Sequence, residues 1–219
     1  MSRTLQDLQN DVVSFFRQTN NTGLDLFEIA CLGKPELTLQ GELLHHLRTA
    51  GWLCVQEAGY RAPVNGSNKL ESRNLDILVF DRTDTYFDTK CCIELKHFSA
   101  NQGSSTTLIA GLEADYSRPR PHHPGALPIM LIGMYTTIHS YSSRPAAPGL
   151  HRFARAVCGP VRSSSFHTDF SVWKTKTASQ WLHGPEILSR STGIPTHHCV
   201  LQSGEQLDGW VEACVGIRR

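Results

Sequence analysis

Apolar side chains recur every three or four positions near the start of the chain, which is the spacing of one face of an α-helix. Residues 4–18 show this spacing and predict a first helix. A second helix is predicted over residues 35–51, because Pro35 suits a helix start and Gly51 suits a helix end. Four leucines form the apolar stripe of this second helix: Leu39, Leu43, Leu44 and Leu47.

After the second helix the pattern changes to short apolar runs, which are typical of β-strands. Three such runs are residues 52–60, 74–81 and 90–98, and turn-rich linkers join them. Helical spacing returns in residues 103–118, and residues 127–137 form a long apolar run of the kind expected in a buried central strand. The order α-β-β-β-α-β predicts an α/β fold with a central sheet flanked by helices.

Beyond residue 138 the pattern is less regular. Residues 150–157 could form a helix, residues 165–175 alternate as in a strand, and residues 204–215 could form a final helix. The chain therefore divides into three parts. These are an N-terminal helical segment over residues 1–35, a core over residues 36–138, and a C-terminal extension over residues 139–219 that we expect to pack on the same domain.

The length and composition fit one globular domain, or one domain with a small appendage. Of the 219 residues, 40% are hydrophobic and 19% are charged, which supplies enough apolar material for a core and argues against disorder. The 7 cysteines are odd in number and form no C-x-x-C pair, which favours reduced thiols. The N-terminus has acid and amide residues where a signal peptide is apolar, and no apolar run is long enough to span a bilayer. We therefore expect a cytoplasmic protein that makes no membrane contact.

Charge is nearly balanced over the whole chain but is unevenly distributed. The net charge is +1, yet no acidic residue occurs between Asp115 and Asp169, where several arginines and histidines are found. This interval could attract phosphate groups. It could equally be a solvated loop region that carries arginines.

Three charged residues interrupt the predicted strands. Asp76 lies in the run 74–81, and Glu94 and Lys96 lie in the run 90–98, although burying a charge is costly. Residues two apart on a strand share a face, so Glu94 and Lys96 point the same way. If the two strands pair as antiparallel neighbours, Asp76 and Glu94 can meet, and a divalent cation would relieve their repulsion. The alternative is an exposed strand face with a cross-strand ion pair.

A further carboxylate lies on the second predicted helix. Glu42 interrupts the leucine-rich side of that helix, so it could face the edge of the sheet. Glu36, about two turns earlier, and Glu57, on the first predicted strand, compete with Glu42 for this role. A solvent-facing position for Glu42 is the other alternative.

This arrangement resembles the PD-(D/E)xK nuclease superfamily, which includes many restriction endonucleases. The matching residues are Glu42 on the helix, Asp76 on the second strand, and Glu94-Leu95-Lys96 as the E-x-K motif on the third. The predicted order of elements also matches, and the resemblance covers roughly residues 36–137. The sequence departs from the motif in having no proline before Asp76. The resemblance implies a restriction-endonuclease-like core and a metal-dependent endonuclease that hydrolyses DNA.

The resemblance also implies roles for the matching residues. Asp76, Glu94 and the backbone carbonyl of Leu95 would hold Mg²⁺ or Mn²⁺, which polarises the scissile phosphate and activates a bound water. Glu42 would bind this metal through water, or a second metal directly. Lys96 would orient the attacking water or stabilise the charge of the transition state.

Substrate contacts are implied with less support. Arg73 precedes Asp76 and could contact phosphate, although a surface position explains it as well. Tyr116 and Arg118 follow the E-x-K motif on the next helix, where relatives often place substrate-contacting residues. Tyr116 could equally belong to the core.

The biological role stays open at this level. DNA is favoured over RNA, although both contain the same phosphodiester, and the activity could serve defence, restriction or repair. One alternative is a non-catalytic module of the same fold that binds nucleic acid or protein. Another is a nuclease toxin neutralised by an inhibitory or immunity partner, and a homodimer would suit the cutting of both strands of a duplex.

Overall fold

A computed structural model gives the fold. It describes residues 3–17, 29, 35–63, 70–82, 87–99, 103–118, 127–141, 166–189, 197–200 and 206–219. The helices are α1 (Leu5–Arg17), α3 (Pro35–Thr49), α4 (Ser105–Tyr116) and α6 (Phe166–Lys176), and a short 3₁₀ turn follows at Ala178–Gln180. The strands are β1 (Leu53–Pro63), β2 (Leu70–Arg82), β3 (Phe87–Ser99), β4 (Ile129–Tyr141), β5 (Trp181–Leu188), β6 (His197–Val200) and β7 (Gln206–Arg218).

One mixed sheet contains all of these strands. Six of them follow the order β1-β2-β3-β4-β7-β5. The seventh strand, β6, pairs with the first part of β7, whereas β5 pairs with the last part of β7. The strands β1, β2 and β3 form an antiparallel meander, β3 and β4 are parallel, and β4 and β7 are antiparallel. The mixed sheet between helical layers agrees with the α/β class predicted from the sequence.

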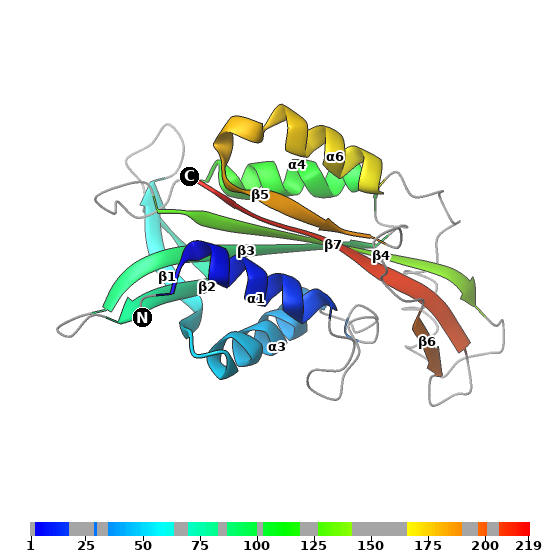
Figure 1. Cartoon of the computed structure of the whole chain (residues 1–219), viewed down its shortest axis with the longest axis horizontal. Coiled ribbons are helices and arrows are strands. Elements are labelled where there is room, and N and C mark those ends of the chain that lie inside the picture. The colour runs from blue at the N-terminus through cyan, green and yellow to red at the C-terminus, as the bar shows by residue number, and fades with distance from the viewer. Residues whose placement is uncertain are drawn as a thin grey trace.

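The helices cover the two faces of the sheet. Figure 1 shows α1 and α3 on one side, here called the α3 face, and α4 and α6 on the other, here called the α4 face. Ile77, Ile93 and Leu95 belong to the buried cluster that contains the leucines of α3, whereas Cys92 and Leu131 belong to the cluster that contains α4 and α6. Side chains of one strand therefore alternate between two separate cores.

Two predictions for the C-terminal region are wrong. Within the run predicted as a strand over 165–175, residues 166–175 lie in α6, whose buried Phe166, Phe170 and Trp173 are spaced by four and three residues as on a helix face. Within the run predicted as a final helix over 204–215, residues 206–215 lie in β7, between β4 and β5. A strand buried on both faces has apolar residues in succession, which hides the alternation of an ordinary strand.

Other predictions agree with the structure or lie outside it. The helices predicted over 4–18, 35–51 and 103–118 correspond to α1, α3 and α4, and the first three strands are longer than expected. The helix suggested for residues 150–157 lies outside the described residues. Within the described part of the chain, every helix is too short or too polar to cross a membrane.

Candidate active site at the divergence of two strands

The sheet splits between β2 and β3. These strands pair from Arg82 and Phe87 as far as Ile77 and Ile93, and then separate. Beyond that point β2 continues beside β1 alone, and β3 continues beside β4 alone. Asp76 and Glu94 are the first residues past the last pair, so the strands place both at the start of the gap.

Two carboxylates occupy the gap as hydrogen-bond acceptors. The backbone N–H of Leu95 donates to Asp76 Oδ2 at 2.7 Å, and the backbone N–H of His97 donates to Glu36 Oε1 at 2.7 Å. These N–H groups point to the side of β3 from which β2 has diverged. Since the N–H and C=O of one strand residue point to the same side, the carbonyl of Leu95 also faces the gap.

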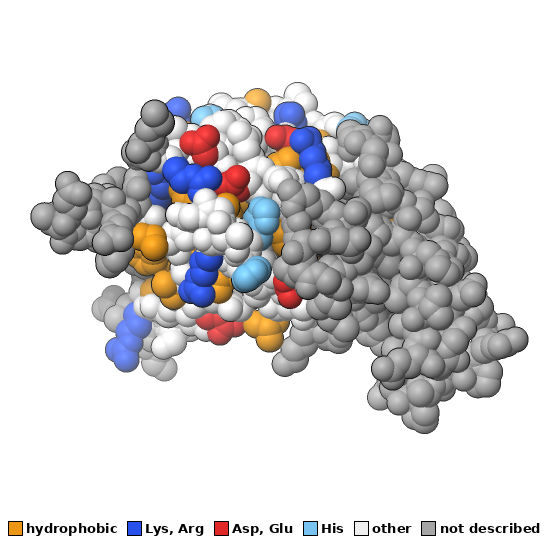
Figure 2. All heavy atoms as spheres, turned by 60° about the horizontal axis from the view of Figure 1, so that its bottom comes forward, with side chains coloured by type: hydrophobic (Ala, Val, Ile, Leu, Met, Phe, Trp, Pro, Cys, Tyr) orange, Lys and Arg blue, Asp and Glu red, His pale blue; other side chains and the backbone are white. Residues whose placement is uncertain are grey.

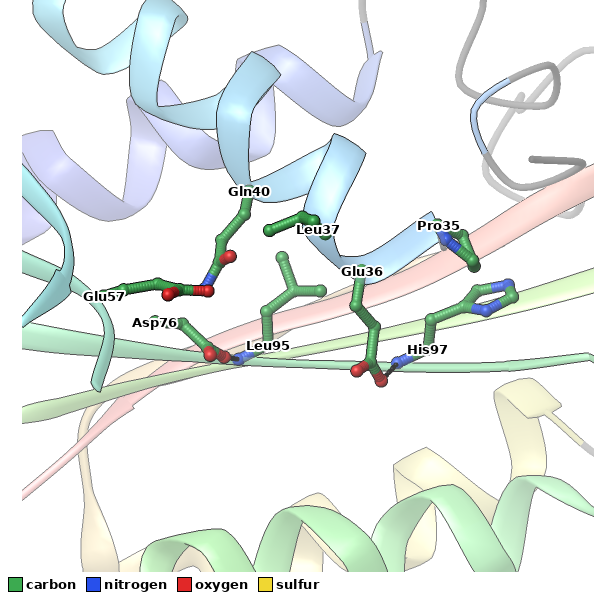
Figure 3. A pocket seen from close by; sticks show the side chains of 8 residues that line it. All are labelled: Pro35, Glu36, Leu37, Gln40, Glu57, Asp76, Leu95 and His97. Carbon is green, nitrogen blue, oxygen red and sulfur yellow. Dashed lines mark hydrogen bonds between the residues drawn. The ribbon is translucent and has the colours of Figure 1, made fainter. Parts of the chain in front are cut away.

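A cavity of about 450 Å³ opens from this gap under the start of α3. Its lining residues are Pro35, Glu36, Leu37, Gln40, Glu57, Asp76, Leu95 and His97. Figure 3 shows Gln40, Glu57 and Asp76 grouped at one end, and Glu36 and His97 at the other. Three carboxylates from three elements therefore line one cavity.

Glu57 has a strained backbone. Its φ of 49° is in the left-handed region, and among the described residues it is the one non-glycine with a positive φ. Such a conformation costs roughly 1–3 kcal/mol, and residues that adopt it cluster at functional sites. Gln56 donates a hydrogen bond to Gln40 on the α3 face, whereas Ala58 packs against the cluster of the α4 face, so the alternation of β1 shifts at Glu57.

The neighbouring strand shows the same irregularity. Leu75 belongs to the α4-face cluster and Ile77 to the α3-face cluster, although they are two residues apart and would normally share a face. The residue between them is Asp76, which lines the cavity on the α3 face. The shift in the alternation of faces in both β1 and β2 therefore places Glu57 and Asp76 in the same cavity.

The surroundings change the proton affinities of Asp76 and His97. Burial raises the pKa of Asp76 to about 6; the Leu95 N–H opposes this rise, Glu36 and Asp115 add to it, and Lys96 opposes it. Burial lowers the pKa of His97 to about 4, so its ring is neutral near pH 7. Its Nε2 forms a 2.8 Å hydrogen bond with Thr136 Oγ1, which fixes the ring. A cation in the cavity would offset the desolvation and repulsion that Asp76 experiences.

The charged side chains of the E-x-K motif lie on the other face. Glu94 is 4% exposed and is aligned with Leu131 of the α4-face cluster. Lys96 Nζ lies 3.3 Å from Asp115 on α4. The strands pair in the antiparallel sense expected from the sequence, but Asp76 lines the cavity while Glu94 and Lys96 do not. Charges on both faces nevertheless change the pKa of Asp76: Glu36 on the α3 face and Asp115 on the α4 face raise it, and Lys96 lowers it.

The remaining predicted residues are placed as follows. Glu42 is half-buried on α3 and is absent from the cavity lining, where Glu36 is found instead. Arg73 forms an ion pair with Glu71 of the same strand. The Tyr116 hydroxyl donates to the backbone carbonyl of Arg219 at 3.0 Å.

Tyr116 is the last residue of α4 and Arg118 lies two residues after it, but their side chains have different neighbours. Arg118 lies 2.5 Å from Asp115, on the side of α4 that holds Lys96. The ring of Tyr116 lies 3.9 Å from the guanidinium carbon of Arg218, which is 1% exposed. Arg118 therefore belongs to the surroundings of the E-x-K lysine, and Tyr116 packs at the C-terminal end of β7.

The cavity has donors for a hard cation without forming a closed ligand set. Among the described residues, no group of three or more histidine, cysteine or acidic side chains is close enough to hold a metal as it stands. Mg²⁺ usually keeps several waters and uses one or two carboxylates, so Asp76 and the Leu95 carbonyl, with either Glu36 or Glu57, would suit a partly hydrated ion. The roles predicted for Glu42, Asp76, Glu94 and Lys96 stay predictions.

Sequence reasoning overlooked Asp115. This residue follows Leu108 and Leu112 at the spacing of one helix face, and it is 1% exposed. An acid that continues the apolar stripe of a helix is unusual, because a buried carboxylate needs a partner. The place of Asp115 in this apolar stripe is therefore the feature of the sequence that could have identified it.

No known protein family, curated protein or solved structure matches this chain.

Proposed function

We propose that this protein is an endonuclease that uses a divalent cation to hydrolyse the phosphodiester bonds of DNA. The observation that carries the proposal is the acidic cavity at the divergence of β2 and β3, where Asp76 meets the backbone of Leu95. The α3-β1-β2-β3-α4-β4 order supports it, since the PD-(D/E)xK resemblance implies this order for the nuclease core. Mg²⁺ or Mn²⁺ is the cofactor of the proposed reaction.

The residues of the cavity have distinct tasks in this proposal. Asp76 and the Leu95 carbonyl would hold the cation, with Glu36 or Glu57 as further oxygen ligands. The bound cation would polarise the phosphate and make water a better nucleophile. The hydrogen bond from Leu95 orients the Asp76 carboxylate, and the neutral imidazole of His97 adds no positive charge that would repel a cation.

Lys96 would act from the opposite side of the gap. Its charge lowers the pKa of Asp76, as the smallest of several influences, so the field of the ammonium group would extend to the point where the cation would bind. A phosphate group at the gap carries negative charge that increases during hydrolysis, and a fixed ammonium group stabilises that charge. Glu94, buried beside Lys96 on β3, stays a candidate ligand of the same centre.

The surface of the α3 side does not by itself identify a polyanionic partner. Among the described residues on that side, acidic and basic side chains are interspersed (Figure 2). Binding of DNA in this proposal therefore depends on the cation and on basic groups near the gap, and binding should fall as salt concentration rises.

A cleavage assay tests the proposal. Supercoiled plasmid with Mg²⁺ or Mn²⁺ should be converted to nicked or linear DNA by the wild-type protein, and chelator should stop the reaction. Asp76→Asn should lower the rate at least about a hundredfold, because it removes the anionic ligand while keeping an acceptor for the Leu95 N–H. Full activity in both Glu94→Ala and Lys96→Ala would contradict the assignment to the E-x-K motif.

A second candidate is a non-catalytic nucleic-acid-binding module of the same fold. The position of Lys96 and Glu94 on the face away from the cavity favours it. Calorimetry separates the two proposals, since the nuclease requires Mn²⁺ binding that Asp76→Asn weakens, and the binding module does not.

A further inference from the structure

Asp115, a buried acid on α4, forms ion pairs with two basic side chains, Lys96 and Arg118, which the resemblance connects with the reaction and the substrate. The side chain of Asp115 is 2% exposed, with Oδ2 at 3.3 Å from Lys96 Nζ and Oδ1 at 2.5 Å from an Arg118 nitrogen. Loss of both contacts would leave the buried carboxylate of Asp115 without a cation, which is costly because little solvent reaches it. The two cations therefore have defined positions relative to α4.

Both cations keep a solvent-accessible side. The side chain of Lys96 is 26% exposed and that of Arg118 is 43% exposed. Each cation therefore presents part of its surface to solvent while its other side contacts the buried carboxylate of Asp115. A phosphate group could contact the exposed sides of both cations while Asp115 holds them from within.

The stem of Lys96 is also restrained by α4. A β-carbon at Gly111, one turn before Asp115, would lie 3.6 Å from Lys96 Cγ and Cε, so the aliphatic stem runs close along the helix. The stem and the ammonium group of Lys96 thus both meet the same helix. A lysine on an open strand face would lack these contacts and would sample many rotamers.

We propose that Asp115 is a positioning residue that fixes Lys96, together with Arg118, for contact with the phosphate groups of the substrate. This inference rests on the proposed nuclease function and adds a residue to it. Asp115 acts through Lys96 and Arg118, and it touches neither the metal ion nor the substrate. Its contribution is preorganisation, because a charge that is already in position needs no reorganisation when negative charge develops on the phosphate.

A double-mutant cycle tests this inference. The proteins are the wild type, Asp115→Asn, Lys96→Met and the double variant, and the substrate is a fluorescein-labelled DNA duplex. Asp115→Asn keeps the shape of the side chain and should lower kcat at least about tenfold while changing KM less than about threefold. In the Lys96→Met background Asp115→Asn should have a smaller effect on kcat than in the wild type, because only Arg118 then remains for Asp115 to position.

Two further variants separate positioning from stability. Asp115→Glu restores the charge and should recover part of the lost kcat. The hydroxyl of Ser105 on α4 donates a hydrogen bond to the carboxylate of Asp169 on α6, in the same helical layer. Asp169→Asn is therefore a matched control for loss of an acid that supports packing. Asp169→Asn should lower the melting temperature with kcat unchanged.

The affinity of the same four proteins for the labelled duplex, measured in EDTA, provides an arm that needs no cleavage. If the wild type cleaves nothing, the nuclease proposal fails, and the positioning inference survives only if Asp115→Asn and Lys96→Met are non-additive in affinity. Additive effects on both kcat and affinity would overturn the positioning inference and leave the nuclease proposal intact. Absence of both cleavage and binding by the wild type would overturn both.

Discussion

The carboxylate of Asp76 accepts a hydrogen bond from the backbone N–H of Leu95 at 2.7 Å, where the strands that carry the two residues separate. A side chain thus provides the acceptor that a continuous β2 would have provided from its backbone. Only one carboxylate oxygen is used in this bond. The arrangement orients Asp76 and leaves acceptor capacity at the gap for a cation.

Asp76→Asn should change how the free energy of unfolding depends on pH. The pKa of Asp76 is about 6 in the folded protein, against 3.8 for an unperturbed carboxyl, so the folded state holds the proton more tightly than the unfolded state. The contribution of Asp76 to the free energy of unfolding is therefore complete below about pH 3.8 and is lost as pH rises through 6. The difference corresponds to roughly 3 kcal/mol. Urea unfolding without divalent cations should show Asp76→Asn gaining about that much relative to wild type between pH 4 and pH 7.

His97→Gln should show the opposite trend. The pKa of His97 is about 4 in the folded protein, against 6.5 when unperturbed, so its stabilising effect is present above pH 6.5 and is lost as pH falls through 4. On acidification from pH 7 to pH 4 the variant should gain roughly 3 kcal/mol relative to wild type. Urea unfolding at the same two pH values checks this, and a pH-independent difference would contradict a buried neutral imidazole.

Glu57→Gly and Glu57→Ala should separate backbone strain from the carboxylate. Glycine adopts a positive φ without strain, so Glu57→Gly should be about 1 kcal/mol more stable than Glu57→Ala, the reverse of the usual order in a strand. Thermal unfolding measures this difference. Both variants should weaken Mn²⁺ binding equally, since each removes the same carboxylate, and a loss in Glu57→Ala alone would argue against the carboxylate as the cause.

A comparison of two glutamates on α3 should show which of them serves the site. Glu36→Gln should lower the rate of plasmid cleavage at least about tenfold, because an amide is a weak ligand for a hard cation. Glu42→Gln is the matched change on the same helix, outside the cavity lining, and should stay within about threefold of wild type. The reverse order would favour the role that the sequence suggested for Glu42.

The sequence predicts the elements as far as β4 better than it predicts the site. The apolar stripe of α3 and the apolar runs of β1, β2 and β3 are local patterns, and burial of each pattern against its neighbours forms the observed layers. The choice between Glu36 and Glu42 also had a local signal. Glu36 and the buried Gln40 are four residues apart and share a helix face, whereas Glu42 does not share it.

The arrangement of faces at the site has no such signal. Alternation predicts that Gln56 and Ala58 share a face, but the positive φ of Glu57 shifts the strand between them, and a glutamate gives no warning of that conformation. The divergence of β2 and β3 depends on pairing with β1 and β4 across long separations in the sequence. The pattern of one strand cannot show where its neighbour leaves it.

The most direct test of the account is the position of Mn²⁺ in a crystal of the wild-type protein grown with that ion, located by anomalous scattering. The proposal predicts Mn²⁺ in the gap between β2 and β3, about 2.1–2.3 Å from a carboxylate oxygen of Asp76 and from the carbonyl oxygen of Leu95. A gap without Mn²⁺ at saturating concentration, or Mn²⁺ bound where Asp76 cannot reach it, would contradict the proposed metal centre.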